Sequence, residues 1–148
     1  MTIGIANDHR AYETKEKLKE LLDDYNIIDY GCYSSERTDY PKYALRLGKA
    51  VIDNEVDLGV VMCGTGIGVS IACNKVKGIR CAKIDNIDEA KSAKEHNNAN
   101  VLAFSAQSHS AEEIKKMIDM FVNSTFNTEP CYKMRIEQVE KYEETNEY

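Results

Sequence analysis

The chain has 148 residues, of which 43% are hydrophobic and 30% are charged, and its formal net charge is −6. This length is typical of one globular domain, so we expect a single domain over residues 1–148 with a charged, frayed tail at 143–148. The negative charge argues against nucleic acid or an anionic membrane surface as the main partner.

The compartment is indicated by what the sequence does not contain. No apolar run approaches the roughly 18 residues of a membrane span, and the chain enters a strand at Thr2 without the layout of a signal peptide. The five cysteines show no paired spacing, which favours reduced thiols over a disulfide framework or a zinc site. They are Cys32, Cys63, Cys73, Cys81 and Cys131. We therefore expect a cytoplasmic protein, with Cys73 and Cys81 in its core.

Strands and helices alternate along the chain. In chain order we predict a strand at 2–6, a helix at 12–22, a strand at 27–30, a helix at 41–53, a strand at 57–62, a helix at 69–75, a strand at 79–84, a helix at 88–95, a strand at 101–104, a helix at 110–123 and a last helix from 132 into the tail. Ser110 and Glu113 have the spacing of a capping box. The alternation predicts an α/β fold, a three-layer α/β/α, Rossmann-like domain with a five-stranded parallel sheet.

Polar clusters follow three of the predicted strands. They are Asn7-Asp8-His9, Cys63 to Gly68, and Asp85-Asn86. The carboxyl ends of parallel strands meet at one edge of a sheet, where α/β proteins bind their ligands. We therefore expect these three clusters to lie at the same edge.

The segment Cys63-Gly-Thr-Gly-Ile-Gly68 joins a buried strand to a helix. A cysteine at a helix N-terminus can act as a base, and glycines leave backbone N–H groups bare enough to hold the negative charge that follows. The alternative is a tight turn with a buried, inert cysteine. A dinucleotide fingerprint is a poor match, because Val69 occupies the place of its third glycine, and no Gly-Lys-Ser/Thr follows to make a P-loop.

The histidines have two interpretations each. Asp8 and His9 form either a loop and cap pair or part of the site at the sheet edge. His96 lies at a predicted helix end, where the helix dipole favours a histidine, and it is also placed to act as an acid or base. The three histidines share no metal-ligand spacing, so we expect no metal.

Several separate motifs, taken in order, resemble those of type-B ribose-5-phosphate isomerases. The motifs are Asn7-Asp8-His9, Ser34 to Pro41, Cys63 to Gly68, Ala72 to Lys75 and His96 to Leu102. The resemblance extends from residue 2 to about residue 142. The family also includes isomerases of six-carbon sugar phosphates such as allose and galactose 6-phosphates.

The resemblance implies aldose–ketose interconversion through a cis-enediolate without metal or cofactor. It assigns the base to Cys63, proton movement between the oxygens to Thr65, and ring opening to His96 with help from Asp8. Some members use a glutamate six positions after this cysteine, but Val69 stands there. The substrate-binding residues that it implies are His9, Tyr43, Gly64, Gly66, Gly68, Ser70, Asn97 and Arg135.

The resemblance weakens at the phosphate. Relatives commonly have arginines where this chain has Gln107 and Cys131, and the sequence leaves open whether Arg10, Lys133 or His109 replaces them. The resemblance as a whole implies ribose 5-phosphate as the leading substrate, and the missing arginines keep other substrates open. The alternatives are a six-carbon aldose 6-phosphate and a non-catalytic paralogue that binds sugar phosphates.

Family members are dimers or dimers of dimers whose sites a neighbouring subunit completes, so we expect a homodimer with the C-terminal helix at its interface.

Overall fold

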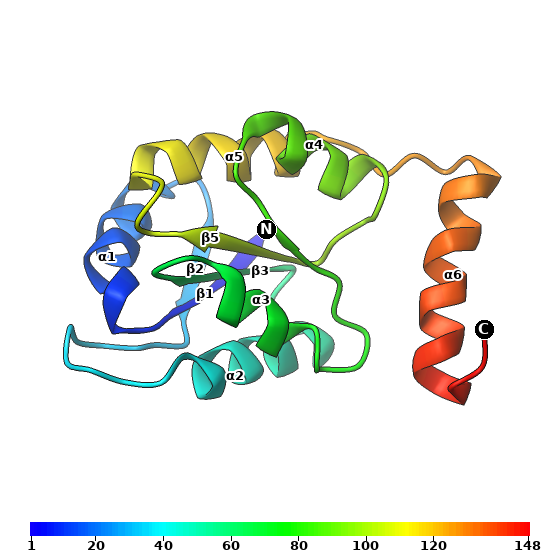
Figure 1. The fold of residues 1–148 in the computed structure, drawn as a ribbon. Helices are drawn as coiled ribbons and strands as arrows, with labels where there is room; N and C mark the ends of the chain where they lie inside the picture. Colours follow the sequence, from blue (N-terminus) through cyan, green and yellow to red (C-terminus); the bar gives the residue numbers. More distant parts are fainter.

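Five parallel strands form one sheet in the order β2-β1-β3-β5-β4 in the computed structural model, which describes residues 1–148 (Figure 1). The strands are β1 (Thr2–Asn7), β2 (Asn26–Asp29), β3 (Leu58–Cys63), β4 (Cys81–Lys83) and β5 (Val101–Ser105). All residues of β3 and β5 are buried, as expected for central strands that are covered on both faces. The predicted fold class is confirmed.

Helices cover both faces of this sheet (Figure 1). The helices of the chain are α1 (Tyr12–Leu21), α2 (Tyr40–Ile52), α3 (Ile67–Cys73), α4 (Ile87–Glu95), α5 (Ala111–Asn123) and α6 (Pro130–Thr145), and a short 3-10 helix, η1 (His9–Ala11), follows β1. Residues of α1, α4 and α5 form one hydrophobic core with the sheet, and residues of α2 and α3 form the other. The predicted capping box at the start of α5 is present, with Ser110 and Glu113 bonded reciprocally.

Helix α6 lies beside the rest of the molecule, at the end of an extended segment (Figure 1). None of its residues is buried, and Met134, Val139 and Tyr142 are exposed. Its contacts with the body include an ion pair between Arg80 and Glu140, 3.2 Å apart, and a hydrogen bond from the Gly78 N–H to Glu143 at 2.9 Å. The helix continues to Thr145, so the first half of the expected frayed tail, 143–145, is helical.

Two elements differ from the prediction. The helix η1 was not predicted, because it depends on the Asp8 side chain, which accepts the Arg10 N–H at 2.9 Å. Strand β4 covers Cys81–Lys83 instead of the expected 79–84, and before its start the Asn100 side chain accepts the Arg80 N–H at 2.8 Å in place of a strand partner. Cys73 is buried as expected, whereas Cys81 is only half-buried.

Candidate active site

Strands β1 and β3 end side by side at the carboxyl edge of the sheet. Asn7 is in register with Met62, and the Asp8 N–H donates to the Met62 carbonyl at 3.2 Å. Because Cys63 directly follows Met62, the Asp8 and Cys63 segments lie at the same edge, as the sequence predicted.

The chain turns sharply after Cys63. Gly66 has a φ of +76°, a left-handed conformation that side chains rarely adopt, and an added Cβ would lie 2.9 Å from the Phe104 carbonyl carbon. Glycine allows the Gly66 N–H to approach Cys63, whose sulfur accepts a hydrogen bond from it at 3.1 Å. The Cys63 residue is 5% exposed. An N–H donor directed at the sulfur stabilises a thiolate, the form of cysteine that can accept a proton.

The first turn of α3 leaves two backbone donors open. The N–H groups of Gly68 and Val69 form no hydrogen bond within the chain. The Ser70 N–H, in contrast, donates to the Gly66 carbonyl at 3.3 Å. It is therefore not free to bind a substrate oxygen, although the sequence led us to expect Ser70 among the substrate-binding residues. Thr65 is exposed, and its hydroxyl oxygen accepts a backbone N–H of α3 at 3.3 Å.

Asp8 is nearly enclosed at this edge, with 6% of the residue exposed. Burial raises the pKa of its carboxyl group, while the hydrogen bond from the Arg10 N–H and the charge of His9 act in the opposite direction. A carboxyl group with a raised pKa keeps its proton more readily, and can then donate it. This chemistry fits an acid placed beside the base at Cys63.

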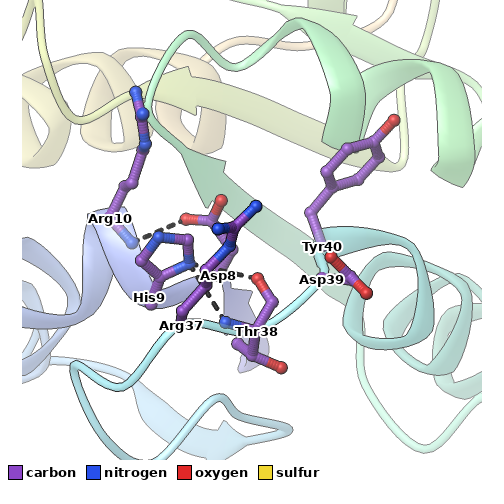
Figure 2. A pocket seen from close by; sticks show the side chains of 7 residues that line it. All are labelled: Asp8, His9, Arg10, Arg37, Thr38, Asp39 and Tyr40. Carbon is purple, nitrogen blue, oxygen red and sulfur yellow. Dashed lines mark hydrogen bonds between the residues drawn. The ribbon is translucent and has the colours of Figure 1, made fainter.

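A pocket of about 440 Å³ opens next to Asp8 (Figure 2). Its lining comes from two segments, the end of β1 with η1 and the loop before α2. The lining residues are Asp8, His9, Arg10, Arg37, Thr38, Asp39 and Tyr40. His9 joins the segments, because its Nδ1 lies 3.0 Å from the Thr38 carbonyl oxygen.

Two aromatic residues of α2 lie against this region. The Tyr43 hydroxyl is 3.3 Å from the Thr38 hydroxyl, which places the expected substrate-binding tyrosine behind the pocket. Tyr40 was not among the expected site residues. Its ring lies so close to Gly68 that a Cβ there would be 2.7 Å from it, so glycine is needed at 68 to let the ring approach α3. The sequence signal for Tyr40 was its place in the loop motif from Ser34 to Pro41.

The other expected residues lie elsewhere. His96, Asn97 and Arg135 line a second pocket of about 270 Å³, together with residues of β4 and α6. The His96 ring stacks on Tyr132 of α6, with ring centroids 4.9 Å apart. His96 caps the end of α4 and precedes β5, so it lies at the amino edge of the sheet. The structure therefore does not bring His96 and Cys63 together within one chain, since β5 spans roughly 13 Å between the two edges.

The residues considered as replacements for the missing arginines have different surroundings. His109 lies 3.4 Å from Asp85, in a separate pocket near β4. Lys133 and Cys131 line a shallow pocket on α6, away from Asp8. Only Arg10 lines the pocket next to Asp8.

No group of three or more His, Cys, Asp or Glu side chains is arranged to hold a metal ion. None of the helices is both long enough and apolar enough to span a membrane.

Comparison with known proteins identifies the family. The family model described as Ribose/Galactose Isomerase matches residues 3–139. The galactose-6-phosphate isomerase subunit LacB of Clostridium acetobutylicum is 39% identical over 85% of this chain and 74% of its own length. Ribose-5-phosphate isomerase B of Escherichia coli is 38% identical over 84% of this chain and 85% of its own. The structure of ribose-5-phosphate isomerase B from Clostridium thermocellum superposes with a TM-score of 0.94 and 35% identity, over 99% of this chain and 100% of the other. The chain therefore belongs to the ribose/galactose isomerase family and is an isomerase.

Proposed function

We propose that this protein interconverts an aldose phosphate and the corresponding ketose phosphate, with ribose 5-phosphate and ribulose 5-phosphate as the leading pair. The observation that carries the proposal is the Cys63 sulfur, held by the Gly66 N–H at 3.1 Å, with the open N–H groups of Gly68 and Val69 in the same turn. This arrangement supplies both a base and donors for an oxyanion. The whole chain, residues 1–148, acts as one domain in this proposal.

The reaction needs two proton movements, one between carbons and one between oxygens. The Cys63 thiolate removes the proton from C2 of the open-chain aldose, and the electrons of that bond form the C1–C2 double bond of a cis-enediolate. The open N–H groups of Gly68 and Val69 hold the negative charge at oxygen. The Thr65 hydroxyl passes a proton between O2 and O1, and the Cys63 thiol then returns its proton to C1. The product is the ketose, and the thiolate is restored without a metal or cofactor.

Ring opening requires an acid–base pair, which one chain does not assemble. Asp8 lies beside Cys63, whereas His96 lies at the opposite edge of the sheet. We therefore place His96, Asn97 and Arg135 of a second copy over the Cys63 edge of the first. The exposed side chains of α6, among them Met134 and Val139, are available to pack against that copy. The minimal active unit is a homodimer, and a dimer of dimers would preserve the same sites.

Two features support the cytoplasm as the place of this reaction. The five cysteines are all unpaired, and a reducing compartment keeps them so. The substrate is a small phosphorylated sugar, and nothing in the charge of −6 favours nucleic acid or a membrane as a partner.

A six-carbon aldose 6-phosphate is the second candidate substrate. Gln107 and Cys131 are neutral at positions where the family resemblance leads us to expect arginine. One relative is named as a subunit of galactose-6-phosphate isomerase. A pocket with fewer fixed charges at these positions could accept a phosphate displaced by one carbon, with Gln107 bonding a hydroxyl group.

A substrate panel tests the proposal directly. Purified protein is assayed with ribose 5-phosphate, allose 6-phosphate and galactose 6-phosphate, and with chelator present throughout. We expect turnover of at least one of them, with ribose 5-phosphate preferred. A folded, dimeric protein that converts none of the three would instead support a binding-only paralogue.

A further inference from the structure

Arg10 lies against the turn that follows Cys63. Its Cδ is 3.0 Å and its Nη1 3.4 Å from the position that a Cβ on Gly64 would occupy. The side-chain amide carbon of Gln107 is 3.4 Å from the same position. The guanidinium of η1 and the amide that follows β5 therefore meet over one glycine, next to the proposed base.

The backbone fixes both partners of this arrangement. The Arg10 N–H donates to the Asp8 carboxylate at 2.9 Å, which anchors η1 to the end of β1. The Gln107 N–H donates to the Gly64 carbonyl at 3.1 Å, which anchors the loop after β5 to the turn after β3. The main chain of Arg10 and of Gln107 is thus held by hydrogen bonds next to the ends of β1 and β3.

The cationic groups of this pocket lack acidic partners. The guanidinium groups of Arg10 and Arg37 form no hydrogen bond or ion pair within the chain, whereas that of Arg80 binds Glu140 and the Asn98 carbonyl. Buried or half-buried guanidinium groups normally find such partners, and an exposed one beside a pocket is available to a ligand.

His9 adds a further donor. Its Nδ1 can accept the Thr38 N–H, 3.3 Å away, and in that tautomer Nε2 carries the proton and is left to donate into the pocket.

Two carboxylates share the pocket and oppose an anion there. One carboxylate oxygen of Asp8 accepts a hydrogen bond from the Arg10 N–H. Asp39 lies on the other side of the pocket, beside Tyr40 (Figure 2). Arg10 extends away from Asp39 in this view, toward the turn after β3 (Figure 2). The positive end of the pocket is therefore the end next to Gly64 and Gln107.

We propose that Arg10 binds the phosphate group of the sugar phosphate, with its guanidinium replacing an arginine at residue 107. A planar guanidinium can bind two phosphate oxygens at once, and Gln107 beside it can donate a further hydrogen bond. The inference rests on the proposed function, since it assigns the phosphate end of that substrate. It also explains how a chain with Gln107 can retain a phosphorylated substrate.

The first experiment compares Arg10→Ala and Arg10→Lys with the wild type in KM, kcat and binding of inorganic phosphate. Loss of a charged hydrogen bond should raise KM roughly ten- to a hundredfold in Arg10→Ala, with a smaller effect on kcat. Arg10→Lys should recover part of the loss, because an ammonium group keeps the charge but not the bidentate geometry. The matched control is Lys77→Ala, which removes an exposed cation between α3 and β4 that forms no hydrogen bond or ion pair within the chain.

The decisive variant moves the guanidinium across the pocket. Gln107→Arg introduced into Arg10→Ala should restore most of the lost affinity, since the two side chains meet over Gly64. An unchanged KM in Arg10→Ala, or a double variant no better than the single one, would overturn the proposal.

Phosphate binding separates this proposal from the proposed function. Inorganic phosphate should protect the wild type against thermal unfolding, and Arg10→Ala should lose that protection even if no sugar phosphate is converted. If the wild type turns over substrate and Arg10→Ala keeps both its KM and its protection by phosphate, the function stands and the role of Arg10 fails.

Discussion

Cys63 is the residue on which the chemistry depends most. The same position would suit an inert core cysteine, and its 5% exposure alone does not decide between the two. A hydrogen bond to the sulfur does not decide by itself, because buried Cys32 also accepts one, from Asn7 at 3.3 Å. The unbonded N–H groups of Gly68 and Val69 in the turn after Cys63 are what favour the reactive interpretation.

Replacing Cys63 tests this interpretation. Cys63→Ala should lower kcat by at least ~10²-fold, on the scale of losing a general base, while leaving the protein folded. Cys73→Ala is the matched control, because it removes a buried thiol at the other end of α3. Steady-state kinetics and circular dichroism on both variants check the prediction. Similar kcat values for Cys63→Ala and Cys73→Ala would remove Cys63 from the mechanism.

The raised pKa of Asp8 makes a prediction about stability. Burial is its largest cause, so the folded state holds more protons than the unfolded state between the ordinary value of 3.8 and the raised value. Stability therefore falls as pH rises through that window, and ionised Asp8 destabilises the fold near neutral pH. Asp8→Asn should unfold at higher urea concentration than the wild type near neutral pH, while its kcat falls.

The comparison across pH contains its own control. The stability advantage of Asp8→Asn should shrink as pH falls through the raised pKa of Asp8 and be lost below 3.8, where wild-type Asp8 is protonated in both the folded and the unfolded state. If Asp8→Asn were more stable than the wild type by the same amount at every pH, or less stable near neutral pH, then burial of the Asp8 carboxyl would not destabilise the fold.

At the scale of elements, α1 is fastened to β2 by a buried ion pair. Lys15 is fully buried, and its Nζ lies 2.8 Å from Asp29 and 2.6 Å from the Cys32 carbonyl. Burial acts against ionisation of Asp29, but hydrogen bonds from Lys15 and Lys19 outweigh it and lower the pKa of the Asp29 carboxyl. This network supports the segment that leads into the loop before α2, and with it Arg37 of the pocket.

Removing the carboxylate should leave the buried Lys15 charge with Glu16, 3.4 Å away and half-exposed, as its remaining acidic partner. Asp29→Asn should therefore cost about 1.5–3 kcal/mol in the free energy of unfolding, the range for a hydrogen bond to a charged group, whereas Asp53→Asn in the exposed pair with Lys49 should cost less than about 1 kcal/mol.

Acid should remove the contribution of Asp29. The pKa of Asp29 is lowered in the folded state, so the stability it provides is present above the ordinary value of 3.8 and is lost as pH falls below it. Urea unfolding of both variants over a pH series measures the two effects. Equal costs for Asp29→Asn and Asp53→Asn would show that burial of Lys15 does not matter to stability.

The sequence predicts the layers of this fold well and their ends less well. Apolar strands and amphipathic helices carry a strong period, which placed most elements within one or two residues. The helix η1 was not predicted because it is held by a hydrogen bond from the Arg10 N–H to the Asp8 side chain. Such a bond leaves no periodic pattern in the sequence. The proximity of Arg10 and Gln107 could not be predicted either. It depends on β1 and β5 both pairing with β3, and no local sequence pattern predicts which strands pair.

At the scale of the whole molecule, the expected catalytic residues divide between two edges of the sheet. Cys63, Thr65 and Asp8 lie at the carboxyl edge, whereas His96 and Arg135 lie with α6. The predicted order of elements is enough to separate them, because Cys63 follows the strand predicted at 57–62 whereas His96 precedes the strand predicted at 101–104. A second copy resolves it, provided that each site takes one group from each chain.

Mixing two inactive variants tests this division. Cys63→Ala and His96→Ala should each be nearly inactive alone. If their subunits exchange at random, half of the dimers are mixed and each mixed dimer has one intact site, so about a quarter of wild-type activity should return. The matched control mixes Cys63→Ala with Asp8→Asn. Both changes affect the same edge, so no arrangement of these chains contains an intact site and no activity should return. Sedimentation confirms that each variant remains dimeric and that exchange has occurred. If exchange is complete and the first mixture gains no more activity than the second, then His96 does not act across the interface, and each chain must close its own site by a movement of α6.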